Sequence, residues 1–216
     1  MIEFFLQHWQ ALLLKTWEHL YISALSLIAG IAVAVPAGIL LARSKRLSGL
    51  FMGLASAFQT IPSLALLAVM IPLLGVGKPP AVAALFAYSL LPILRNTCLG
   101  IKGVDPGVVD AARGMGMTRG QVLLWVRLPL AAPVIMAGSR VSGTYLVSWA
   151  TIASYVGAGG LGDFIFMGLN NYIPPMIVLG TLPVTALALL TDLALGRVER
   201  ALSPRLRSVP EGGERR

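Results

Sequence analysis

Long uncharged runs alternate with short basic segments along this chain. A bilayer core about 30 Å thick is crossed by ~20 apolar residues in helical conformation. Such runs lack the period-two alternation of a membrane β-strand, and only helices or closed barrels satisfy the backbone in lipid. The pattern therefore predicts an all-α integral membrane protein of about five transmembrane helices. The predicted spans are residues 19–42, 49–77, 81–100, 130–156 and 175–196.

Residues 1–18 carry a different pattern. Apolar side chains recur there at helical spacing, while Glu3 and Gln7 lie off that stripe. The segment is too short and too polar to span a membrane, so we interpret it as an amphipathic helix on the membrane surface. The alternative is an extension of the first span. The predicted organisation is an interfacial helix (1–18), a transmembrane domain (19–196) and a basic tail (197–216).

The composition supports a membrane protein and excludes several soluble classes. Charged residues are 12% of the chain and hydrophobic residues 56%, too few charges to cover a soluble fold or to favour disorder. The net charge of +8 is also compatible with nucleic-acid binding. However, the basic residues lie between the apolar runs, which favours the lipid bilayer over nucleic acid as the partner.

The distribution of basic residues predicts the orientation of the spans. Cytoplasmic loops carry an excess of Lys and Arg. If the loop after the first span is cytoplasmic, most of the 17 basic residues lie on that side, in that loop, in residues 102–129 and in the tail. The N-terminus is then expected outside and the C-terminus in the cytoplasm.

The loop of residues 102–129 has the signals of a short helix. Asp105 followed by Pro106 is typical of an N-cap and a first helical position. Gly114 and Gly116 are expected to end the helix, since glycine accepts a left-handed conformation. The predicted apolar side of this helix consists of Val108, Val109, Ala112 and Met115.

A second helix is expected to follow at once. Thr118 and Gln121 have the spacing of a capping box. The resulting helix–turn–helix elbow is too small for a core of its own. It needs either a partner groove or the lipid headgroups, and the residues alone do not decide between these two.

The spacing D-A-A-x3-G-x9-V-x-L-P, from Asp110 through Gly116 to Pro129, resembles the E-A-A-x3-G-x9-I-x-L-P loop of permease subunits of binding-protein-dependent ABC importers. Asp110 replaces Glu and Val126 replaces Ile. In that family the loop is the coupling helix, which docks into a cleft of the ATP-hydrolysing subunit. The resemblance assigns ATPase coupling to Asp110, Ala111, Ala112, Met115, Gly116, Met117 and Pro129.

Further segments extend the resemblance over nearly the whole chain. They are similar to the short permeases of osmoprotectant importers, which carry glycine betaine, choline or carnitine. Methionine-type permeases of the same superfamily are the nearest alternative. The segments are Q-T-I-P-S-L-A-L-L from Gln59, P-L-L-G-V-G-K from Pro72, S-L-L-P-I-L-R-N-T from Ser89, S-W-A-T from Ser148 and G-A-G-G-L-G-D from Gly157.

The resemblance implies an architecture and a set of partners. The expected fold is that of a type I ABC importer permease in the plasma (inner) membrane of a prokaryote. The expected partners are a cytoplasmic ATP-binding subunit dimer, a second permease subunit in a homo- or heterodimer, and an extracytoplasmic substrate-binding protein. No cofactor is expected on this chain, because ATP and Mg²⁺ would bind the ATPase subunit.

The glycine-rich segment 157–163 follows the fourth predicted span. We interpret Gly157, Gly159, Gly160, Gly162 and Asp163 as an outer gate or a contact for the binding protein; a plain connector is the alternative. The segment also satisfies G-x-G-x-x-G, but a dinucleotide site requires a preceding strand, which a membrane helix does not supply.

Polar groups at membrane depth are candidates for the translocation path. Arg140 in the fourth span either contacts substrate or pairs with a neighbouring helix. Gln59 and Pro62 predict a break in the second span. The break either frees carbonyls that line a path or is a kink that serves helix packing. Arg95 and Asp192 lie near span ends, where snorkelling accounts for them.

Aromatic faces are the natural partners of a quaternary ammonium, which donates no hydrogen bonds. Tyr145, Trp149 and Tyr155 lie on the fourth predicted span. They form either a weak cation path or a belt of lipid anchors at the outer interface, and the second interpretation is the more common one.

A membrane enzyme or secondary carrier and a nucleic-acid-binding protein are the two rival classes to the importer subunit. The chain contains no phosphate-binding loop, no H-E-x-x-H and no nucleophile elbow, so it is not expected to be the ATPase or a membrane enzyme. A stand-alone secondary carrier would transport without an ATPase partner. A nucleic-acid-binding protein would be recovered in the soluble fraction.

Overall fold

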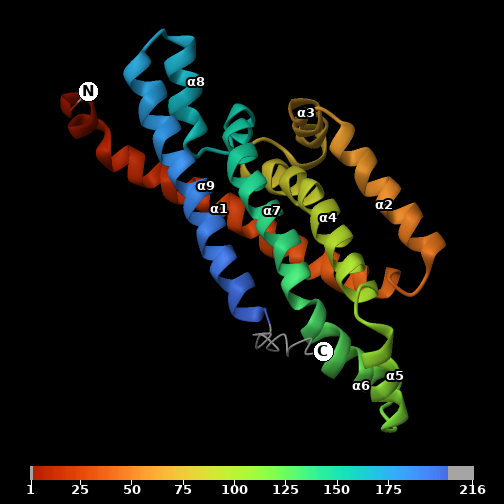
Figure 1. Cartoon of the computed structure of the whole chain (residues 1–216). Helices are drawn as coiled ribbons and strands as arrows, with labels where there is room; N and C mark the ends of the chain where they lie inside the picture. Colours follow the sequence, from red (N-terminus) through yellow and green to blue (C-terminus); the bar gives the residue numbers. More distant parts are fainter. Residues whose placement is uncertain (1, 204–216) are drawn as a thin grey trace, which may run out of the picture.

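The computed structural model describes residues 2–203 and is helical throughout its regular elements. Figure 1 shows long helices packed side by side, with shorter helices at both ends of the bundle. The elements are α1 (Ile2–Leu41), α2 (Lys45–Thr60), α3 (Ser63–Leu74), α4 (Lys78–Lys102), α5 (Pro106–Gly114), α6 (Arg119–Gln121), the π-helix η1 (Val122–Arg127), α7 (Leu128–Ala153), the 3-10 helix η2 (Ser154–Val156), α8 (Gly162–Asn170) and α9 (Pro174–Leu202).

The predicted number of spans agrees with the helices. Within residues 2–203, four helical stretches are long and apolar enough to cross a membrane, and the bent pair α2–α3 makes a fifth if it counts as one span. Their outer faces expose large apolar side chains such as Ile28, Leu73 and Leu182. Such a surface is unfavourable in water and suits contact with lipid.

The first helix differs from its prediction. α1 is a single 40-residue helix, so no boundary separates residues 2–18 from the first span. The physical reason is local: no glycine or proline interrupts the chain before Gly30. His19, at the predicted boundary, is instead fully buried, and its Nε2 lies 2.8 Å from the Val147 carbonyl oxygen on α7. The placement of residues 1–18 on the membrane surface stays a prediction.

The predicted break in the second span is confirmed. α2 ends at Thr60, α3 begins at Ser63, and the two helices bend by 98°. Pro62 is the N-cap residue of α3, and the residue before a proline is disfavoured in the helical region. Ile61 accordingly has extended backbone angles.

The core of the bundle forms around α4, which packs between α1 and α7. Fully buried Ile22, Leu146 and Ala150 meet residues of α4 at one level, and Ala34 meets Ile93 and Cys98 at another. α7 in turn packs against α9. Small residues on α1 permit the closest approach: a side chain at Gly30 would meet Ser89, and one at Gly38 would meet Thr97. This small-residue stripe therefore packs within the subunit.

The two ends of the bundle carry different elements. α5 and α6 project beyond the ends of α4 and α7, on the same side as the C-terminal ends of α1 and α9, whereas α8 lies at the opposite end with the N-terminus (Figure 1). The basic tail also differs from its prediction, because α9 continues to Leu202 instead of ending at residue 196. The remainder of the predicted tail, residues 204–216, lies outside the described residues.

Candidate functional site

The first candidate site is the elbow, which we define as residues 105–121. Its predicted start is confirmed: the Asp105 carboxylate accepts hydrogen bonds from the Gly107 and Val108 amides, at 2.6 and 3.4 Å, and Pro106 is the first residue of α5. Its predicted turn is confirmed by Gly116, whose φ of +84° lies in the left-handed region. These devices hold α5 in one orientation without a large core.

The second half of the elbow is fixed by side-chain capping. The Thr118 amide donates to Gln121 Oε1 at 2.8 Å, and the Gln121 amide donates to Thr118 Oγ1 at 3.4 Å, which confirms the predicted capping box. α6 then continues through the π-helix η1 into α7. The elbow is thus continuous with α7 through η1.

The predicted single apolar face of α5 is wrong, because the helix divides its apolar residues between two directions. Val109 and Ala112 are buried against Val122 and, with it, form a small cluster. Val108 and Met115 point outward, and Met115 is 74% exposed. The reason is that Val109 and Ala112, three residues apart, suffice to seat so short a helix on η1, which leaves the neighbouring positions free.

The predicted coupling residues also fall into a group that faces inward and a group that is exposed. Ala112 and Met117 face the elbow's own cluster, whereas Ala111, Met115 and Gly116 are exposed. Asp110 is also exposed, and its carboxylate pairs with Arg113 at 3.4 Å. Pro129 is exposed near the start of α7. An exposed apolar patch on a projecting segment such as the elbow is typical of a surface that contacts a partner protein.

The glycine-rich segment 157–163, here called the glycine connector, links η2 to α8 at the other end of the bundle. Gly160 has a φ of +91°, and a side chain there would lie 3.2 Å from His19 Nδ1. The connector therefore runs directly against α1. Gly162 is also buried, against Thr151 and Ser154, whereas Gly157 is exposed.

Charged groups of α1 fasten the glycine connector. Lys15 forms ion pairs with Asp163 at 2.7 Å and with Glu18 at 3.0 Å. Glu18 accepts a hydrogen bond from the Gly160 amide at 3.1 Å and lies 3.6 Å from Lys78. Lys15 and Glu18 were not predicted as site residues, because Asp163 and Gly160 follow them by more than 140 residues and no local pattern indicates contacts between such distant residues.

The third candidate site is an aromatic cluster beside the broken span. The Tyr88 and Trp149 ring centroids are 4.5 Å apart at an edge-on angle, and Tyr145 stacks on Trp149 at 5.9 Å. Tyr88 donates a hydrogen bond to the Ile61 carbonyl at 2.7 Å, and Gln59 donates to the Tyr88 carbonyl at 3.2 Å. The cluster thus joins α7 to the break between α2 and α3.

The structure separates the three aromatic residues predicted on the fourth span. Tyr145 and Trp149 belong to the aromatic cluster, and Tyr88 on α4 completes it, although the sequence analysis did not select Tyr88. Tyr155 lies apart and packs edge-on against Phe166 at 5.1 Å. With two-thirds of its surface exposed, Tyr155 has the position of a lipid anchor.

Arg140 was predicted either to contact substrate or to pair with a neighbouring helix, and in the structure it pairs with α9. Its guanidinium donates to both carboxylate oxygens of Asp192 on α9 at 2.7 Å, and to Glu199 at 3.1 Å. Snorkelling therefore does not describe Asp192, whose carboxylate is bound by Arg140 in bidentate geometry. Arg140 also packs closely on Gly196 of α9.

These features together describe a helical protein with membrane-length apolar helices and an exposed elbow, and the comparisons with known proteins identify its class. Residues 34–208 match the family of binding-protein-dependent transport system inner membrane components. The chain belongs to this family and is a multi-pass component of a membrane transport system, as the motifs of residues 110–129 predicted.

Individual relatives match over almost the full chain. The carnitine transport permease protein OpuCB of Listeria monocytogenes is 54% identical, and the match covers 99% of each chain. The choline transport system permease protein OpuBB of Bacillus subtilis (strain 168) is 52% identical over 94% of each chain. Among solved structures, the inward-facing MetNI methionine ABC transporter matches with a TM-score of 0.80 and 25% identity, covering 89% of this chain and 96% of the other.

Proposed function

We propose that this chain is the permease of an ATP-driven importer for small quaternary amines such as carnitine, choline or glycine betaine. The substrate class follows from relatives 52–54% identical that are named as carnitine and choline transport permeases. The single observation that carries the coupling part of the proposal is the elbow, a capped stub with its apolar residues Val108 and Met115 exposed.

The elbow performs its role through contact with a separate ATP-binding subunit. Ala111 leaves room for close approach, and Met115 offers a flexible, polarisable contact. Asp110, beside Arg113, orients polar contacts at the edge of the patch. ATP and Mg²⁺ bind the partner, and closure of the ATPase pair moves two elbows together. Because the elbow continues through η1 into α7, the movement reaches the membrane helices as a rigid-body switch.

The proposed function also implies how the helix bundle is oriented in the membrane and how the permease subunits assemble. The elbow end faces the cytoplasm, where the ATPase is located, and the arginines of the elbow agree with the charge rule for cytoplasmic loops. The glycine connector then faces outward, where the binding protein delivers substrate. Two permease subunits, identical or homologous, enclose the path between them.

The aromatic cluster is the best candidate for the substrate path within this subunit. Aromatic faces attract a quaternary ammonium through their quadrupoles without hydrogen bonds. Tyr88, Trp149 and Tyr145 place such faces beside the break of the span, where the Tyr88 hydroxyl donates to the Ile61 carbonyl. Gln59 and Pro62 hold that break in place. Arg140, already bound by two carboxylates, serves the path as a support of α7 rather than as a substrate ligand.

A methionine importer is the second candidate, because the MetNI structure shares the fold over 89% of this chain. The two candidates differ in the charge of the cargo's headgroup: methionine carries a primary ammonium, which requires hydrogen-bond acceptors, whereas the quaternary amines do not. Uptake of labelled carnitine, choline and methionine therefore separates the candidates.

The experiment reconstitutes the chain with its ATPase and binding protein in liposomes and measures ATP-dependent uptake. Ala111→Asp and Gly116→Asp are expected to abolish uptake while the protein still inserts and assembles in the membrane. The matched control is Ala201→Asp, an exposed alanine in the last turn of α9, which should transport normally. Normal uptake by both elbow variants would refute the assigned role.

A further inference from the structure

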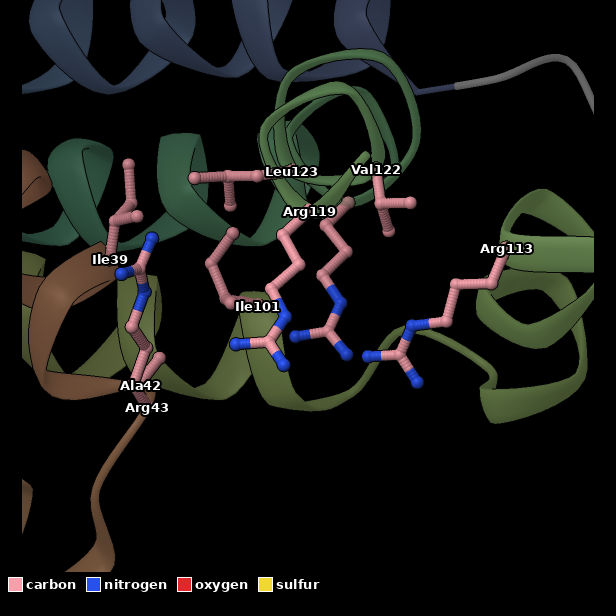
Figure 2. Close-up of a pocket in the computed structure, with 9 residues that line it drawn as sticks. Ile39, Ala42, Arg43, Ile101, Arg113, Arg119, Val122 and Leu123 are labelled. Atoms are coloured by element: carbon pink, nitrogen blue, oxygen red, sulfur yellow. The ribbon is translucent and has the colours of Figure 1, made fainter. Parts of the chain in front are cut away.

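A cavity of about 380 Å³ lies between the elbow and the ends of α1 and α4. Among residues 2–203, four of the lining residues are arginines and none is acidic. They come from four elements: Arg43 follows α1, Arg113 lies on α5, Arg119 on α6 and Arg127 on η1. In Figure 2 the Arg113 side chain extends toward that of Arg119, and Arg43 lies at the end of α1. Like charges gathered in one cavity repel each other, so an anion would stabilise this arrangement.

Most of these arginines have no ion-pair partner among the residues that the structure describes. Among residues 2–203, Arg113 alone of the four makes an ion pair, with Asp110 at 3.4 Å on the exposed side of α5. The Nε of Arg127 is buried and has no hydrogen-bond partner. An unpaired buried donor of this kind is costly.

The cavity also has apolar lining residues. Ile39, Ile101 and Leu123 line it, and they belong to the ends of helical stretches that are long and apolar enough to span the membrane. The cavity is thus amphipathic and lies at the level where membrane helices leave the lipid. A guanidinium fork matches a phosphate group in bidentate geometry, and basic pockets between membrane helices suit lipid headgroups.

We propose that this cavity binds the phosphate group of an anionic phospholipid, with the lipid's apolar part along Ile39, Ile101 and Leu123. The phosphate occupies the cavity beside Arg119 and Arg127 and accepts hydrogen bonds from their guanidinium groups. The bound lipid joins α1 and α4 to the elbow and so stiffens the element that carries the exposed Met115. The inference concerns the isolated permease and does not depend on the identity of the transported substrate.

The test uses the full-length permease purified in a mild detergent, without its partners. Native mass spectrometry counts bound phosphatidylglycerol, with phosphatidylcholine as the zwitterionic comparison. We expect phosphatidylglycerol to be preferred by the wild type and its binding to fall about fivefold for each arginine removed in Arg119→Gln/Arg127→Gln. The matched control is Arg46→Gln/Arg197→Gln, two exposed arginines outside the cavity. Arg43→Gln is the milder variant if the double variant does not fold.

A second arm distinguishes a lipid from free phosphate. Thermal unfolding of the wild type is measured with increasing inorganic phosphate and, separately, with phosphatidylglycerol. Stabilisation by the lipid that the double variant loses and the control retains supports the proposal. Equal phosphatidylglycerol binding by the wild type and the cavity variants overturns it, and so does stabilisation by inorganic phosphate alone with no preference for the anionic lipid.

Discussion

Arg140 on α7 binds both carboxylate oxygens of Asp192 on α9, 52 residues later in the chain, through hydrogen bonds of 2.7 Å. The pair fixes the register of two membrane helices, and Glu199, about two turns further along α9, adds a third hydrogen bond to the same guanidinium. Because α7 is also the helix that leads into the elbow, the ion pair links the stub to the last helix of the bundle.

Removal of one partner should therefore weaken the helix bundle. In Asp192→Asn the guanidinium loses its bidentate carboxylate partner and keeps only the hydrogen bond to Glu199, so the strongest contact between α7 and α9 is removed. We expect a lower temperature of thermal unfolding in detergent and reduced ATP-driven uptake. The exchanged pair Arg140→Asp/Asp192→Arg should recover part of both losses. An unchanged unfolding temperature in Asp192→Asn would show that the pair does not hold α7 and α9 together.

The small-residue stripe of α1 makes a second prediction. A Cβ at Gly38 would lie 2.7 Å from the Thr97 Cβ and 3.3 Å from the Leu94 carbonyl oxygen, so Gly38→Val must push α1 away from α4. Overpacking of this kind costs about 1–3 kcal/mol in the free energy of unfolding, measurable by chemical denaturation in detergent. Gly53→Val is the matched control, since nothing lies within 4 Å of a side chain at Gly53. Equal stability of the two variants would contradict the packing.

The anchoring of the glycine connector is tested by amide hydrogen exchange. Glu18→Ala removes the acceptor of the Gly160 amide and two of the ion pairs around Lys15 and Lys78. The loss of about 1 kcal/mol of local stability corresponds to about fivefold faster exchange of the connector. Glu199→Ala, at the opposite end of the bundle, serves as the control. Unaltered exchange of residues 157–163 in Glu18→Ala would count against the anchor.

The aromatic cluster predicts which rings matter for transport. Trp149→Leu should slow uptake of a quaternary amine about twofold to thirtyfold, the range expected for loss of a cation–π contact of about 0.5–2 kcal/mol. Trp149→Phe should retain more activity, because it keeps an aromatic face. Tyr155→Leu, outside the cluster, should transport at the normal rate. A rate in Trp149→Leu equal to that of the wild type would remove the cluster from the substrate path.

Local signals explain which parts of the fold and site were predictable. The caps at Asp105 and Thr118, the turn at Gly116 and the break at Pro62 follow from backbone preferences of a few neighbouring residues. Pairings between distant helices leave no such signal, which is why Tyr88 with Trp149 and Lys15 with Asp163 were missed. The continuous α1 corresponds to the alternative of an extended first span, because a change from a polar to an apolar pattern does not end a helix unless a glycine, proline or cap stops it.

The direction of side chains on short helices was the least predictable feature. Val108 and Val109 are adjacent and equally apolar, yet one is exposed and the other buried. Their difference depends on where η1 lies, and η1 is a π-helix that the spacing of apolar residues did not indicate. Met117 faces inward for the same reason, although its resemblance to the family motif suggested a contact for the partner.

The central claim, that the elbow contacts an ATP-binding subunit in the cytoplasm, is tested most directly by a single cysteine at position 111. Cys98 is the only cysteine of the chain and is fully buried, so Cys98→Ala supplies a cysteine-free background. In the assembled transporter, we expect Ala111→Cys to cross-link to the ATPase subunit and to be inaccessible to a membrane-impermeant thiol reagent added outside the cell. Labelling from outside, or no cross-link from position 111 in an active transporter, would contradict the account.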